Sequence, residues 1–132
     1  MIRDFNRGNS GWTDWNLLLD ERGGPNHVEN FCFAPVHGDT QTGELIFTPS
    51  YYYIGHFSKF VQPEAQRLST SSNKGMLLAT SFANVDGTMA TIVMNMTEDA
   101  VDYSLFVGTA EAKLKIPARA MQTLTYLSLI HI

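Results

Sequence analysis

Two tryptophans and a carboxylate lie close together near the start of the chain, in the run Gly11-Trp12-Thr13-Asp14-Trp15-Asn16. In an extended segment, a two-residue repeat places Trp12 and Asp14 on one face and Trp15 on the other. A tryptophan at this place has two interpretations. It anchors a core, which is the usual location of a lone tryptophan, or it offers a ligand a flat apolar surface and one N–H donor.

The other reactive side chains show no spacing typical of a metal site or a nucleophile. No metal-ligand spacing links Cys32 or an acid with the histidines, which are His27, His37, His56 and His131. A nucleophile-elbow context is missing around Ser10, Ser50 and Ser58. Cys32 is the only cysteine, which excludes a disulfide within the chain. We therefore predict no metal and no cofactor.

Short elements separated by turns are expected in the first half of the chain. Residues 2–7 predict the end of a helix, because Ile2 and Phe5 would share a face. Residues 11–16 predict a strand that the apolar residues 17–19 continue. The two glycines and the proline of residues 20–25 then predict a turn. Residues 45–47 are expected to form a short extended segment.

A helix is expected after these elements. Thr48 followed by Pro49 is a typical helix start, with a capping hydroxyl and a proline at the first helical position. Helical spacing predicts a buried stripe of Tyr53, Phe57, Phe60 and Val61. The pair Gln62-Pro63 stops the helix, and we place the domain boundary at this proline.

Alternating patterns follow Pro63 and predict an antiparallel β-sandwich. The expected strands are 76–84, 88–97, 101–107, 112–116 and 121–127, and Asp86-Gly87 is a hairpin turn. Lys113 and Lys115 alternate with apolar residues, so both should face water.

Composition excludes some partners. The chain of 132 residues has a net charge of −4 and no basic cluster, which argues against a nucleic-acid partner. No apolar run approaches the ~20 residues of a membrane span, so no transmembrane segment is predicted.

The runs GWTDWNLLLDERGGPNHVENFCFAP and TPSYYYIGHFSKFVQPEAQR resemble the C-terminal part of glycoside hydrolase family thirty, the glucosylceramidase-like enzymes. The resemblance covers roughly residues 3 to 126 and rests on WxDWN, GGPN and PSYYYIGHFSKF in this order. It implies an α+β fragment that is mainly β, with the last β/α unit of a TIM barrel followed by an antiparallel β-sandwich. Residues 1–62 would be the end of the catalytic barrel (strand 8, loop and helix 8) and 63–127 the sandwich. Residues 128–132 would be a tail outside the family pattern.

No catalytic residue is assigned within the chain. A retaining glycosidase needs two carboxyl groups ~5–5.5 Å apart, and nothing in the spacing of the local acids brings two of them together. These acids are Asp14, Asp20, Glu21, Glu29 and Glu44. The family's two catalytic glutamates stand at the ends of the fourth and seventh barrel strands, so the resemblance places both upstream of Met1. The chain alone is therefore expected to be inactive.

The resemblance also implies three substrate-binding residues. Trp15, at the end of strand 8, would contact the glucose unit, and Asp14 on the opposite face would be a structural acceptor. Asn30 and Phe31 match residues that line the pocket entrance near the aglycone, although a loop-capping Asn and a core Phe are equally compatible with the sequence.

Three functional hypotheses follow. The first is the C-terminal part of a retaining β-glycosidase, whose full-length form acts on a β-glucoside or glycolipid; glucosylceramide, β-1,6-glucan and xylosides are the candidate substrates. Its partners would be the missing N-terminal barrel and sandwich strands. The second is a non-catalytic β-sandwich that binds carbohydrate or a protein partner. The third is an inactive truncated product, in which residues 1–62 would be unstable alone.

Overall fold

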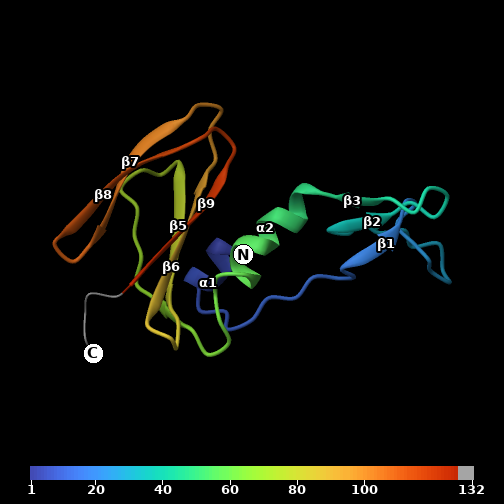
Figure 1. The fold of residues 1–132 in the computed structure, drawn as a ribbon, viewed down its shortest axis with the longest axis horizontal. Helices are drawn as coiled ribbons and strands as arrows, with labels where there is room; N and C mark the ends of the chain where they lie inside the picture. The colour runs from blue at the N-terminus through green and yellow to red at the C-terminus, as the bar shows by residue number, and fades with distance from the viewer. Residues whose placement is uncertain (128–132) are drawn as a thin grey trace. The chain divides into compact units, whose positions relative to one another are not determined.

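The computed structural model describes residues 1–127, which form two compact units (Figure 1). The smaller unit is Gly11–Gly55, and the larger one combines Met1–Ser10 with the chain from His56 onward. The predicted tail, residues 128–132, lies outside the described residues. Within the described part of the chain, no helix is long and apolar enough to span a membrane.

The smaller unit contains a three-stranded sheet of very short strands: β1 (Leu18–Asp20), β2 (Val36–Gly38) and β3 (Leu45–Phe47). The central strand β2 pairs in parallel with β1 and antiparallel with β3. Leu19, Ala34 and Val36 are the buried hydrophobic residues of this unit. The extended segment predicted at residues 45–47 is confirmed as β3, whereas β2 was not expected.

The prediction of a strand over residues 11–16 is wrong, because the strand begins only at Leu18. Asn16 has a φ of +57°, in the left-handed region, which interrupts an extended chain. The exposed carboxylate of Asp14 accepts the backbone N–H of Trp15 at 2.9 Å, a local bond that competes with strand pairing. In the chain as described, Asp14 is thus an exposed acceptor of a local backbone N–H.

The larger unit is an antiparallel β-sandwich (Figure 1), as the alternating patterns predict. One sheet has the order β4-β5-β6-β9, and the other is the hairpin β7–β8. The strands are β4 (Gln66–Leu68), β5 (Leu77–Ala83), β6 (Thr88–Asn95), β7 (Val101–Val107), β8 (Ala110–Ile116) and β9 (Met121–Leu127). The strands predicted from residue 76 onward are confirmed to within a few residues, and β4 was missed.

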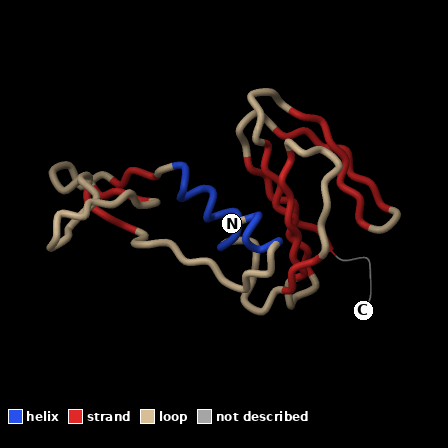
Figure 2. Tube along the Cα trace, turned by 180° about the vertical axis from the view of Figure 1, so that it is seen from behind, coloured by secondary structure: helices blue, strands red, loops and turns tan. Residues whose placement is uncertain are grey.

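Both faces of the four-stranded sheet are covered. On one face, Leu77, Val93 and Ile116 form a core between the two sheets. On the other face, Phe82 and Ile92 pack with apolar residues of α1 (Ile2–Asn6) and of the end of α2 (Pro49–Ser58). Figure 2 shows α1 on the side of the sheet that faces away from the β7–β8 hairpin. The sheet is therefore the middle layer of this unit.

The sequence predicted helix α1 more accurately than helix α2. Helix α1 is confirmed, and its residue Ile2 is buried. Helix α2 begins at Pro49 as predicted but ends at Ser58, and only Phe57 of the expected stripe is buried. The hydroxyl of Thr48 donates to the carbonyls of Ala34 and Pro35, so this side chain ties the helix start to the preceding loop instead of capping the helix.

Candidate functional site

The segment that carries Asn30 and Phe31 is a loop between β1 and β2, and its ends are tied together. We call Asp20, Gly23 and Cys32 the loop neck. The N–H of Gly23 donates to the carbonyl of Asp20 at 3.0 Å, and the N–H of Cys32 donates to the carbonyl of Gly23 at 2.9 Å. The carboxylate of Asp20 accepts the N–H of Gly24 at 2.7 Å. This geometry is that of a compact loop whose ends are close, a type that often carries function.

The tip of this loop is organised by an asparagine. Asn26 Oδ1 accepts the backbone N–H groups of Val28 at 3.3 Å and of Asn30 at 3.0 Å. The resulting turn leaves Asn30 and Phe31 at the surface, where 57% of Phe31 is exposed. Both side chains are thus available to a ligand, and Phe31 is not a core residue in this structure.

Trp15 stands on the segment that precedes β1, and 73% of it is exposed. Within the smaller unit as described, it is therefore not a core anchor. Trp15 makes no hydrogen bond or ring contact with Asn30 or Phe31 among the described residues. Asn30 and Phe31 are brought together by one loop, whereas Trp15 comes from a separate segment.

Three carboxylates of the smaller unit, those of Asp20, Glu21 and Asp39, accept backbone N–H groups of turns and loops. The backbone N–H of Thr40 donates to Glu21, and this bond holds the pKa of that carboxyl below its ordinary value. N–H groups of Thr42 and Gln41 likewise lower the pKa of Asp39. The acid/base of a glycosidase needs a raised pKa, so neither carboxyl has the electrostatic environment of that group. The geometry provides no reason to assign either one to catalysis.

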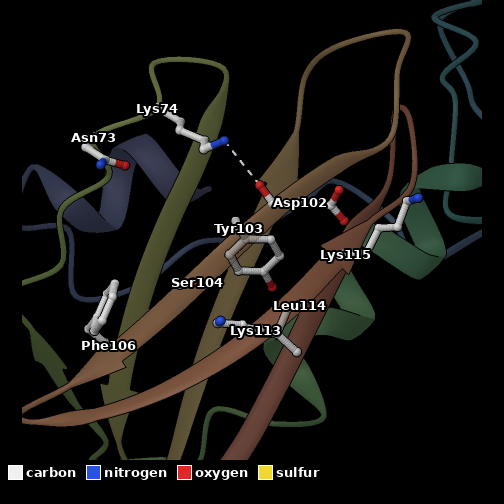
Figure 3. Close-up of a pocket in the computed structure, with 9 residues that line it drawn as sticks. All are labelled: Asn73, Lys74, Asp102, Tyr103, Ser104, Phe106, Lys113, Leu114 and Lys115. Atoms are coloured by element: carbon white, nitrogen blue, oxygen red, sulfur yellow. Dashed lines mark hydrogen bonds between the residues drawn. The ribbon is translucent and has the colours of Figure 1, made fainter.

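A separate hollow of about 700 Å³ lies on the sandwich, beside the hairpin β7–β8 (Figure 3). Its lining residues are Asn73, Lys74, Asp102, Tyr103, Ser104, Phe106, Lys113, Leu114 and Lys115. The ammonium of Lys74 donates to the backbone carbonyl of Asp102 at 3.2 Å. Asp102 is the only acid in this lining, so the hollow lacks the carboxyl pair of a glycosidase. Lys113 and Lys115 are exposed, as predicted.

Sequence patterns assigned no role to His37, which the structure places at the base of the loop. Its ring contacts the backbone of both Asp20 and Ala34. The only sequence feature that could have pointed to His37 is its place as a polar residue directly after the apolar Val36. That signal is weak, because polar residues are common in half-buried strands.

Both parts of the chain match a known family. Residues 1–61 match the sequence model of the glycosyl hydrolase family 30 TIM-barrel domain, and residues 64–124 match that of the family's beta sandwich domain. The chain belongs to glycosyl hydrolase family 30. Its fold is accordingly the end of a TIM barrel followed by the β-sandwich, with β-structure predominating.

Three similar proteins illustrate the relationship. Lysosomal acid glucosylceramidase of Mus musculus is 35% identical over 97 residues, which are 73% of this chain and 19% of the mouse protein. SrfJ from Salmonella typhimurium has a crystal structure that superposes with a TM-score of 0.93 at 37% identity, over 96% of this chain and 28% of that one. The endo-beta1,6-glucanase BT3312 gives a TM-score of 0.88 at 25% identity, over 96% of this chain and 29% of that one. The family-30 chain therefore spans less than a third of each of these relatives.

Proposed function

We propose that this chain is the C-terminal part of a retaining β-glycosidase that hydrolyses β-glucosides, with glucosylceramide or a related glycolipid as the substrate class. Both family-30 domain matches and the similarity to the mouse glucosylceramidase support the proposal. The domain division that goes with it is 1–62 for the barrel end and 63–127 for the sandwich.

The observation that carries the proposal is the apolar surface of the smaller unit. Most of the large apolar side chains that are exposed in the described part of the chain belong to Gly11–Gly55: Trp12, Trp15, Leu17, Leu18, Val28, Phe31, Phe33, Leu45, Ile46, Phe47, Tyr51, Tyr52 and Tyr53. An apolar surface of this kind normally marks an interaction site. In the proposal, the remaining barrel covers part of it, and the substrate contacts the rest.

Three residues have substrate-binding roles in this proposal. Trp15 contacts the glucose unit, because sugars present C–H faces to aromatic rings and hydroxyls to N–H donors. Asn30 offers an amide to a hydroxyl at the pocket entrance. Phe31 provides an apolar contact for the lipid or aryl aglycone. The exposure of all three side chains is compatible with these roles.

The reaction itself needs residues from outside this chain. Double displacement requires a carboxylate nucleophile and a carboxylic acid/base ~5–5.5 Å apart. In the proposal both are glutamates of the preceding barrel strands. The sandwich would likewise be completed by strands from the N-terminal part, which would extend the two-stranded β7–β8 layer.

A hydrolysis assay on the isolated chain tests the assignment of the acids. We expect no release of fluorophore from 4-methylumbelliferyl β-D-glucoside by the purified chain. Measurable hydrolysis that disappears on substitution of one local Asp or Glu would refute the placement of both catalytic groups upstream. Saturable glucan binding by the isolated chain without hydrolysis would instead favour the non-catalytic sandwich module.

A hybrid enzyme tests the substrate-binding roles. In the mouse glucosylceramidase, the matched 97 residues are replaced by those of this chain, and hydrolysis of the same glucoside is measured. We expect activity in the hybrid and a loss of about 10²-fold or more in kcat/KM with Trp15→Ala, through lost positioning of the sugar. Trp12→Ala is the matched control and should retain most of the activity. Equal effects of the two substitutions would count against the role of Trp15.

A further inference from the structure

The ring of His37 bridges the two ends of the loop that carries Asn30 and Phe31. Its Nδ1 lies 2.7 Å from the carbonyl oxygen of Asp20, and its Nε2 lies 3.1 Å from the backbone nitrogen of Ala34. Asp20 is the last residue of β1, and Ala34 stands just before β2. The imidazole therefore closes the base of the loop by contacting it at both ends.

The two contacts define the protonation state of the ring. The Ala34 nitrogen carries an N–H and can only donate, so Nε2 must accept. The carbonyl of Asp20 can only accept, so Nδ1 must carry the proton. Both bonds therefore form only with the neutral imidazole that is protonated on Nδ1. A side chain without both a donor and an acceptor at these places would lose at least one bond.

The surroundings hold the ring in this orientation. His37 lies in the middle of β2, where its backbone is opposite Leu19 on one side and Ile46 on the other. The ring of Phe33 lies against the imidazole with centroids 5.2 Å apart. Ala34 is fully buried, so its N–H depends on His37 for a partner.

We propose that His37 is a positioning residue of the substrate pocket: its neutral ring fixes the base of the loop and thereby the place of Asn30 and Phe31. This inference rests on the proposed function, in which these two residues contact the aglycone. His37 itself does not touch the substrate. Its effect should therefore appear in the choice between aglycones and not in the chemistry at the sugar.

Nuclear magnetic resonance on the full chain tests the bridge without reference to activity. The ring nitrogens of His37 should show a protonated Nδ1 and an unprotonated Nε2 near neutral pH. In His37→Phe, which retains an aromatic ring for Phe33, exchange of the Ala34 amide should become faster by roughly tenfold or more. His27→Phe, at an exposed place in the same loop, is the control and should leave that exchange unchanged. Slow exchange of the Thr48 amide, which donates to the carbonyl of Pro35 in the same unit as His37, reports that the smaller unit of each variant is folded.

Protonation on Nε2 instead of Nδ1 would overturn the bridge. So would fast exchange of the Ala34 amide in the unmodified chain, or equal exchange rates in the two variants.

The hybrid enzyme tests the consequence for substrate choice. There, His37→Phe should reduce the preference for octyl over methyl β-D-glucoside about fivefold through a higher KM for the octyl compound, with little change in kcat. An unchanged preference would overturn the positioning role. A hybrid without activity in any variant would refute the proposed function and leave the exchange result valid.

Discussion

Two buried threonines on neighbouring strands give opposite predictions for the same substitution. Thr80 on β5 and Thr91 on β6 are both 0% exposed. The Oγ1 atom of Thr91 lies 2.8 Å from Ser81 Oγ and 2.9 Å from the hydroxyl of Tyr126. By contrast, Thr80 Oγ1 has no hydrogen-bond partner among the described residues. Valine replaces the hydroxyl by a methyl group of similar size, so each variant isolates the contribution of the hydroxyl.

The expected magnitudes follow from these contacts. Burial of a hydroxyl without a partner costs about 1–3 kcal/mol in proteins. Thr80→Val should therefore raise the free energy of unfolding of the sandwich unit by about 1 kcal/mol. Thr91→Val removes two hydrogen bonds of about 0.5–1.5 kcal/mol each and should lower it by about 2 kcal/mol. The two variants should thus differ by roughly 3 kcal/mol.

Urea unfolding followed by circular dichroism measures this difference. Because both substitutions are on the same sheet, the slope of the free energy against urea should stay the same, and only the midpoint should move. Thr80→Val should move it upward and Thr91→Val downward. If Thr80→Val lowers the midpoint as much as Thr91→Val does, the Thr80 hydroxyl has a partner in solution, and the reasoning is refuted.

Three further predictions concern the loop, pH and the core. Gly23 has a φ of +87°, and an added Cβ would overlap the backbone of the loop neck, whereas Gly43 has a φ of +76° with open space around it. Gly23→Ala should therefore accelerate amide exchange in the neck about fivefold more than Gly43→Ala. Desolvation holds the pKa of His56 below its ordinary value of 6.5, so the unfolded chain binds a proton that the folded chain does not. The free energy of unfolding should therefore fall as the pH drops through 6.5, and the urea midpoint of His56→Gln should fall less. Ile116→Ala should lower the free energy of unfolding by about 2–5 kcal/mol, against less than about 0.5 kcal/mol for the exposed Lys115→Ala on the same strand, as measured by thermal melting.

The sandwich strands could be predicted because their signals are local. The turn at Asp86-Gly87 and the alternation over residues 121–127 each lie within one short stretch of sequence, and the hairpin β5–β6 and strand β9 follow from them. The failure at residues 11–16 has a different origin. A strand forms only where a neighbour pairs with it, and the pattern of Trp12 and Trp15 contains no information about such a neighbour.

The candidate site also has a part that the sequence indicated and a part that only the structure shows. Trp15, Asn30 and Phe31 were found through resemblance to a family, not through any property of their spacing. The loop that carries two of them is closed by bonds from Asp20 and His37, and His37 is 17 residues further along the chain. Contacts between residues so far apart depend on the fold, so a single sequence does not reveal them.

The aromatic layer beneath the four-stranded sheet has a consequence for recombination between relatives. Phe5 and Phe57 belong to the segment that matches the barrel domain, yet they pack on Phe82, which belongs to the segment that matches the sandwich. An exchange of residues 64–124 between relatives would replace only the Phe82 position of this three-residue cluster. A chimera that exchanges this segment should therefore fold only when the donor and the recipient carry compatible residues at all three positions. The three residues should accordingly vary together among relatives.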